Sequence, residues 1–162
     1  MRVIQAEYPQ DWLTTKAEDS GLKQAEWRTD PNRSGAGGCI GDIGTHAYNL
    51  IRFITGLEVD EISADIHTFV EGRKVDDNAQ IMLRFKGGAK GSIWSSQVAV
   101  GNENNLKIRI YGENAGIEYR QEYDKSNNCY PTIDDGIDGM KFIENVIKSS
   151  KNNSKWIQFN SN

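Results

Sequence analysis

An aspartate and a histidine four residues apart are the side chains of this sequence best suited to chemistry. Asp42 and His46 lie in the run G-D-I-G-T-H at residues 41–46. In a helix, this spacing places both side chains on one face. An imidazole can take a proton from an alcohol near neutral pH, and a nearby carboxylate orients the ring. The pair predicts a proton acceptor for oxidation of a hydroxyl group, whose hydride must pass to a cofactor because no side chain accepts one.

The same spacing also has a purely structural interpretation. Asp42 can simply cap the helix, as aspartate often does. His46 can then form a hydrogen bond with Asp42 on an exposed surface. Taken alone, the spacing favours this structural interpretation, because a short motif supports only a hypothesis.

A metal-dependent hydrolase is a third interpretation. Its site would combine Asp42 and His46 with His67 and with Asp76 or Asp77. Zinc sites favour several His or Cys ligands, whereas the sequence has 2 histidines in all. His67 falls in a predicted strand, and Asp76 and Asp77 are typical of a turn before the next strand. The sequence therefore does not predict that these groups converge.

A single helix must carry the Asp42–His46 pair. Apolar side chains recur at the helical period over residues 43–54, and Gly56 is placed to end the helix. This apolar stripe leaves the pair on the other side, where the glycine-rich residues 35–38 allow a ligand to approach the backbone. Residues 10–41 are otherwise expected to be irregular.

Alternating apolar and polar residues predict a sheet. The predicted strands cover residues 3–8, 59–68, 79–85, 89–100, 106–111 and 117–121. Short turns between them indicate consecutive hairpins and a largely antiparallel sheet. After a polar linker, a final helix begins with a capping-box pattern at residues 132–135. The predicted class is α+β, an open sheet with helices on one face, built as a single domain over residues 1–162.

Composition excludes several classes of protein. The net charge is −4 and no stretch is densely basic, so nucleic-acid binding is not expected. No apolar run approaches the ~18–20 residues that span a bilayer. Cys39 and Cys129 form no metal-type pair, and with no secretion signal a cytoplasmic location is the default expectation.

Several motifs in one order carry a resemblance to a known family. They are W-R-T-D-P at residues 27–31, the glycine loop at 35–38, the 41–46 run, V-D-D at 75–77, A-K-G-S-I at 89–93, I-R-I-Y-G at 108–112, and the closing helix with K-W at 155–156. This order resembles the C-terminal domain of the Gfo/Idh/MocA oxidoreductases, and the resemblance covers most of the chain.

The resemblance implies a substrate domain. In such enzymes an N-terminal Rossmann domain binds NAD or NADP, and the second domain supplies the pocket for a sugar or polyol. Carried over, Asp42 and His46 lie beside the substrate, with His46 as proton acceptor. Arg28 matches a position near the pocket, and Trp12 matches a loop that lines it in sugar-oxidising members. Family members also associate through the open sheet, so a homo-oligomer is expected.

The sequence departs from the family in two places. The glycine loop offers Gly35 and Gly37, but Ile40 stands where a dinucleotide fingerprint needs its third glycine. The family's Glu-Lys-Pro segment, which supplies a catalytic lysine, is also missing, and the chain is shortened near residues 122–130. We therefore expect no Rossmann domain in this chain and no activity from the chain alone. The alternative is a non-catalytic sheet domain that serves oligomerisation or partner binding.

Overall fold

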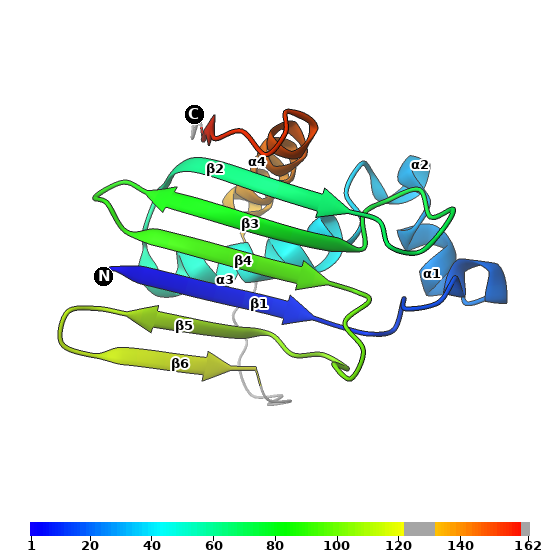
Figure 1. Ribbon diagram of the computed structural model, residues 1–162, viewed down its shortest axis with the longest axis horizontal. Coiled ribbons are helices and arrows are strands. Elements are labelled where there is room, and N and C mark those ends of the chain that lie inside the picture. The colour runs from blue at the N-terminus through cyan, green and yellow to red at the C-terminus, as the bar shows by residue number, and fades with distance from the viewer. Residues whose placement is uncertain (122–131, 160–162) are drawn as a thin grey trace.

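A single seven-stranded sheet organises the chain. The computed structural model describes residues 1–121 and 132–159. Its strands run in the order β6-β5-β1-β4-β3-β2-β7 (Figure 1). Their bounds are β1 Val3–Pro9, β2 Val59–His67, β3 Asn78–Phe85, β4 Lys90–Ser96, β5 Lys107–Tyr111, β6 Gly116–Arg120 and β7 Ile157–Gln158. The predicted strands are all present, and β7, which has only two residues, was not predicted.

The first strand lies in the middle of the sheet. β1 pairs in parallel with β4 and antiparallel with β5, whereas every other pair is antiparallel. The hairpin expected between residues 89–100 and 106–111 is therefore wrong, because β1 is inserted between β4 and β5. Central placement suits β1, since Ile4, Ala6 and Tyr8 alternate inward and are all buried.

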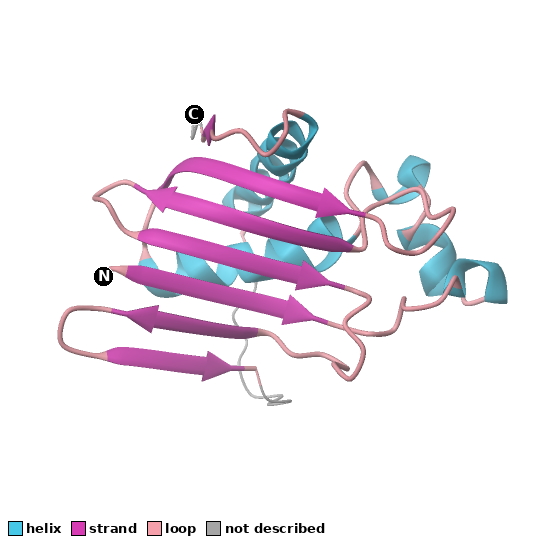
Figure 2. Cartoon of the chain, in the orientation of Figure 1, coloured by secondary structure: helices cyan, strands magenta, loops and turns pink. Residues whose placement is uncertain are grey.

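Two long helices cover one face of the sheet. α3 (Thr45–Thr55) packs on β1, β4 and β5, and α4 (Ile133–Lys151) packs on β2 and beside α3 (Figure 2). Tyr48 of α3 stacks on Phe142 of α4 with ring centroids 4.4 Å apart. The predicted capping box of α4 is confirmed, because the side chains of Thr132 and Asp135 each bond the other's backbone N–H. The α+β class with helices on one face is thus confirmed.

Residues 10–41 contain more regular structure than predicted. A 3₁₀ turn, η1 (Ala17–Ser20), and two short helices, α1 (Lys23–Arg28) and α2 (Pro31–Ser34), lie beyond the ends of β1 and β4 (Figure 1). Helices of four to six residues are too short to show a helical period, so the sequence does not reveal them. The polar linker at 122–130 and Cys129 lie outside the described residues. No helix of the described residues has the length and apolar character needed to cross a membrane.

Candidate functional site

A widened helical turn carries Asp42. Residues Ile40–Gly44 form a π-helical turn, η2, in which the Thr45 N–H bonds the Ile40 carbonyl five residues back. Such turns occur mostly as single insertions in α-helices and often lie at functional sites. Asp42 lies inside this turn rather than at its start, so the interpretation of Asp42 as a helix cap is wrong.

The cap comes instead from a distant residue. The buried carboxylate of Asp76 accepts the Gly38 N–H at 2.7 Å and the Ile40 N–H at 2.9 Å. The Cys39 N–H bonds the Asp76 backbone carbonyl at 2.9 Å. Burial is the main cause that raises the pKa of Asp76 above its ordinary value. Asp76 therefore fixes the start of the helix that bears the candidate site, and its interpretation as an ordinary turn residue was incomplete.

Gly38 makes this arrangement possible, because a side chain does not fit there. A Cβ atom at Gly38 would lie 2.1 Å from the Asp76 carbonyl oxygen and 2.7 Å from Val75 Cγ2. We expect Gly38→Ala to lower the free energy of unfolding by roughly 1–3 kcal/mol or more, measured by urea denaturation. Gly136→Ala is the matched control in α4, where a Cβ meets nothing within 4 Å, and should stabilise by about 0.5–1 kcal/mol. Equal effects of the two changes would contradict this account of the loop.

One oxygen of Asp42 is held by two protein donors. Arg28 Nε donates to Asp42 Oδ2 at 3.2 Å, and Gln97 Nε2 donates to the same oxygen at 2.8 Å. Gln97 is 2% exposed and immediately follows β4. Asp42 Oδ1 accepts no hydrogen bond from the described residues. The carboxylate is thus fixed in orientation with one oxygen left to accept a ligand hydroxyl.

A polar cavity of about 340 Å³ lies beside this carboxylate. It is lined by Tyr8, Gln10, Trp12, Gln24, Arg28, Asp42, Ile43, His46 and Glu103. The lining comes from the end of β1 and the loop that follows it, from α1, from the π turn and α3, and from the loop before β5. The structure thus brings all four predicted site residues together, and the volume is in the range of small-molecule sites.

Four residues with polar groups line this cavity without having been predicted as site residues: Tyr8, Gln10, Gln24 and Glu103. Gln10 and Tyr8 precede Trp12 in the stretch whose family likeness suggested Trp12, so that likeness was the available signal. Gln24 and Glu103 lie in segments without a motif. Buried Gln97 lies behind the cavity, and only the fold brings it to Asp42.

His46 lies on the exposed side of α3. Its ring is at 6.2 Å from the Tyr8 ring, edge to face, and forms no hydrogen bond or ion pair with the described residues. The expected contact between Asp42 and His46 is therefore absent, in both its structural and its ring-orienting versions. Both side chains instead face the same cavity separately.

A second cavity is also lined by Arg28, Asp42 and His46. It measures about 310 Å³, and its lining includes the glycine loop at 35–38, Trp27 and Met140 together with Arg28, Asp42 and His46. The Arg28 guanidinium stacks on the Trp27 ring at 4.4 Å. Asp42 and His46 are thus accessible from two sides.

The metal-site interpretation finds no support in the geometry. Within residues 1–121 and 132–159, no three His, Cys, Asp or Glu side chains lie close enough to hold a metal ion. Asp76 is bound to backbone amides, and Asp77 is paired with Arg73 at 3.1 Å.

Arg73 ties the loop of Trp12 to the end of the sheet. Its fully buried guanidinium donates to the carbonyls of Leu13 and Thr15, each at 2.9 Å, and to Glu18 and Asp77. Asp77 also accepts two backbone N–H groups, from residues 69 and 70. Leu13 is bonded in turn to the Gln97 carbonyl. This network supports one wall of the 340 Å³ cavity.

Comparison with known proteins decides the family. Residues 1–118 match the family model described as the GFO/IDH/MocA C-terminal domain. The chain belongs to the Gfo/Idh/MocA family. Its family resemblance in sequence is therefore confirmed, and the sheet with its covering helices is the C-terminal domain of this oxidoreductase family.

Individual relatives give the extent of the similarity. Levoglucosan dehydrogenase of Pseudarthrobacter phenanthrenivorans is 30% identical over 134 residues, covering 63% of this chain and 34% of that protein. Glucose-6-phosphate 3-dehydrogenase of Bacillus subtilis is 22% identical over 135 residues, covering 79% and 37%. An inositol dehydrogenase homolog of Azotobacter vinelandii, solved with NAD+, superposes with a TM-score of 0.89 at 20% identity and covers 98% of this chain and 58% of its own. Where a relative matches 98% of this chain, the match spans only 58% of the length of that relative.

Proposed function

We propose that this Gfo/Idh/MocA chain is the substrate-binding and proton-accepting half of an NAD(P)-dependent oxidoreductase that acts on a hydroxyl of a sugar or polyol. The observation that carries the proposal is the convergence of Asp42, His46, Trp12 and Arg28 on one polar cavity. Similarity to an inositol dehydrogenase homolog that was solved with NAD+ and to levoglucosan dehydrogenase supports the reaction class.

The side chains have separate tasks in the proposed reaction. Asp42 Oδ1 accepts a hydrogen bond from one substrate hydroxyl, while Arg28 and Gln97 hold the other carboxylate oxygen. His46 takes the proton of the hydroxyl that is oxidised. As that O–H bond breaks, the C–H bond of the same carbon breaks with its electron pair and the carbonyl forms. A nicotinamide, when bound, supplies the hydride acceptor for this chemistry.

The described residues do not fit a dinucleotide site of their own. The glycine loop precedes a π turn and follows the short helix α2 rather than a strand, and the Gly38 and Ile40 amides are taken by Asp76. We therefore assign no cofactor-binding role to the described residues of this chain. The proposal places the cofactor on a further domain or partner, consistent with the length of the relatives.

The proposal predicts that the folded chain alone does not turn over. We expect no NAD(P)-dependent oxidation of myo-inositol, levoglucosan or glucose, followed by absorbance at 340 nm, and no saturable energy transfer from tryptophan to NADH. A fusion of this chain to the part of the Azotobacter vinelandii protein that lies outside the match should oxidise at least one of these compounds. Turnover by the chain alone would contradict the division of labour proposed here.

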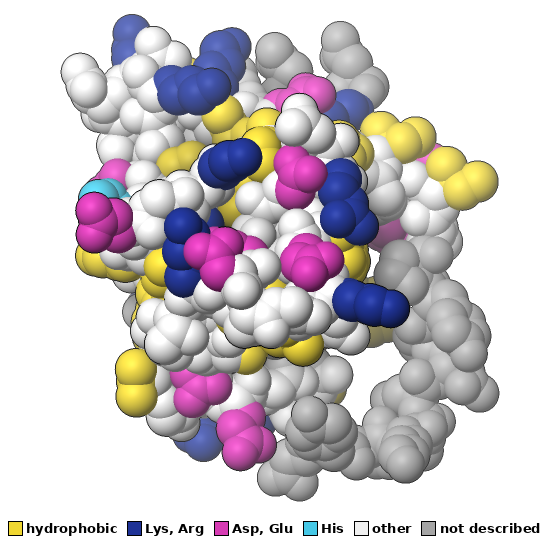
Figure 3. Space-filling model, turned by 90° about the vertical axis from the view of Figure 1, so that its right-hand side faces the viewer, with side chains coloured by type: hydrophobic (Ala, Val, Ile, Leu, Met, Phe, Trp, Pro, Cys, Tyr) yellow, Lys and Arg dark blue, Asp and Glu magenta, His cyan; other side chains and the backbone are white. Residues whose placement is uncertain are grey.

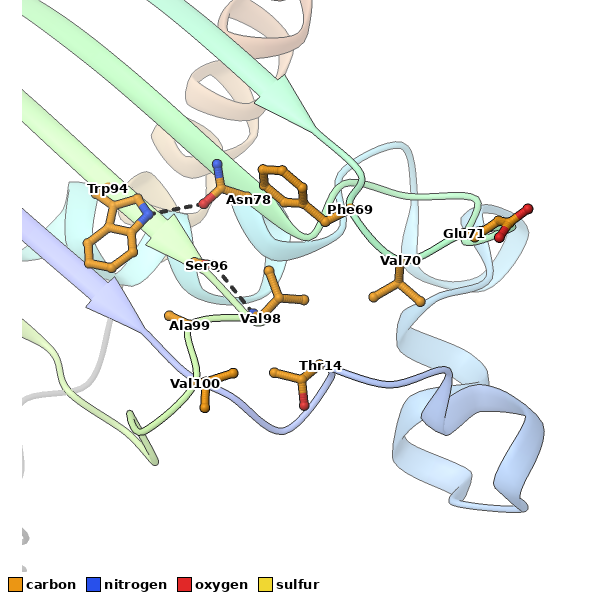
Figure 4. Close-up of a pocket in the computed structure, with 10 residues that line it drawn as sticks. All are labelled: Thr14, Phe69, Val70, Glu71, Asn78, Trp94, Ser96, Val98, Ala99 and Val100. Atoms are coloured by element: carbon orange, nitrogen blue, oxygen red, sulfur yellow. Dashed lines mark hydrogen bonds between the residues drawn. The ribbon is translucent and has the colours of Figure 1, made fainter.

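A second function is favoured by the open face of the sheet. A cavity of about 650 Å³ lies there at the ends of β3 and β4, lined by Trp94, Asn78, Phe69 and Val100 among others (Figure 4). Phe69 is 63% exposed and Val100 is 82% exposed, and exposed apolar side chains that cluster often mark a protein interface. We propose that copies of the chain associate through this face. Sedimentation should then show an oligomer that Val100→Asp dissociates, and a monomer at all concentrations would contradict it.

A further inference from the structure

The cavity of about 340 Å³ beside Asp42 is lined by more acidic than basic side chains. Among the described residues that line it, Arg28 is the only Lys or Arg, whereas Asp42 and Glu103 both carry carboxylates. Arg28 Nε is already paired with Asp42 at 3.2 Å, and its guanidinium is stacked on Trp27. The single cation is thus matched by an internal partner, and Glu103 leaves the described wall with a net negative charge.

The remaining described lining is suited to hydroxyl groups. Gln10 and Gln24 carry neutral amide groups, which can donate and accept hydrogen bonds, and Trp12 offers an apolar ring face. The Trp12 indole N–H donates to Gln10 Oε1 at 2.9 Å, and Gln10 Nε2 donates to Asn104 at 2.9 Å. These bonds fix the two side chains before a ligand arrives.

The nearby glycine loop does not supply a phosphate site either. Backbone N–H groups at the start of a helix readily bind an anion. Here the Gly38 and Ile40 N–H groups already bind the buried carboxylate of Asp76. Figure 3 views the molecule from the end where β1 and β4 finish. Acidic and basic side chains are interspersed there, so this end does not form a continuous basic surface.

We propose that this cavity selects neutral polyhydroxyl compounds and rejects phosphate esters, with Glu103 as a specificity-determining residue. The inference rests on the proposed function, whose substrate class it narrows. A phosphate monoester carries about −1.5 to −2 charges at pH 7. Proteins usually recognise such a group with Arg or Lys side chains that are not already neutralised, or with free backbone N–H groups. Bringing it beside Asp42 and Glu103 adds like-charge repulsion.

Matched ligand pairs test this on the folded chain itself. Glucose and glucose 6-phosphate, and myo-inositol and myo-inositol 1-phosphate, differ within each pair only in the phosphate. Each is titrated into ¹⁵N-labelled chain at pH 7.5 while the indole N–H signals of the 4 tryptophans are followed. The Trp12 signal reports binding in this cavity, because Trp12 lines it. The internal controls are Trp94, which lies on the opposite face of the sheet, and Trp156, which stacks on Arg84. Trp12→Phe assigns the reporting signal.

The outcomes separate the two proposals. We expect a neutral compound to shift the Trp12 signal saturably, and its phosphate ester to bind at least about tenfold more weakly. A phosphate ester that binds as tightly as its neutral partner would overturn the selectivity and leave the proposed function standing. If no compound of either kind moves Trp12, both the selectivity and the assignment of this cavity as a sugar site are wrong.

Charge variants test the role of Glu103. Glu103→Lys should raise the affinity for the phosphate ester relative to its neutral partner by about tenfold or more. Glu113→Gln is the distant control, because Glu113 pairs with Arg2 in the turn at the other end of the sheet, and it should leave the ratio unchanged. An unchanged ratio in Glu103→Lys would remove Glu103 from the proposal.

Discussion

Arg73→Ala should lower the free energy of unfolding by roughly 3–5 kcal/mol, measured by urea denaturation followed by circular dichroism. The Arg73 side chain is 0% exposed and pairs with Asp77, which is also 0% exposed, at 3.1 Å. Removing it leaves the Asp77 carboxylate buried without its cation and frees the carbonyls of Leu13 and Thr15. Since Leu13 adjoins Trp12, the cavity wall should loosen as well.

Two further variants bound the size of this effect. Arg2→Ala removes an ion pair with Glu113 whose partners are 64% and 70% exposed, so it should cost less than about 1 kcal/mol. Arg73→Lys keeps the charge but loses the forked donors, and should fall between the two. A cost of Arg73→Ala no larger than that of Arg2→Ala would show that the buried network does not hold the fold.

His46→Ala should reduce turnover of the active fusion protein by about 10²–10⁴-fold, the usual contribution of a general base. The reason is that His46 is the only histidine among the described residues that line the cavity, and histidine is the side chain that most often serves as a general base. His67→Ala is the matched control, because His67 ends β2 beside Phe69 and lines neither cavity that contains Asp42. Turnover within a few-fold of the unchanged fusion would contradict the role of His46.

The sequence predicted most of the sheet because its strands are local patterns. Alternation places Ile81, Leu83 and Ile93 in the core, and all three are buried. The α3 stripe and the α4 capping box are equally local. The order of strands is not local, because pairing of β1 with β4 joins residues that lie far apart in the chain. The predicted hairpin failed for this reason.

The candidate site shows the same division. Residue types and family likeness pointed to Asp42, His46, Arg28 and Trp12, which line one cavity. The residues that hold the site in place lie far away in the sequence. Asp76 bonds Gly38 over a separation of 38 residues, and Gln97 bonds Asp42 over a separation of 55. The expected contact between Asp42 and His46 assumed an ordinary helix, whereas the chain forms a π turn at Ile40–Gly44.

A crystal structure of the chain soaked with myo-inositol tests the central claim most directly, because it shows which cavity binds a polyol. We predict that the ring lies in the cavity bounded by Trp12 and Arg28, with one hydroxyl on Asp42 Oδ1 and another within hydrogen-bond distance of a His46 ring nitrogen. A polyol bound instead in the cavity at Trp94 and Phe69 would contradict the assignment of Asp42 and His46 as the substrate site.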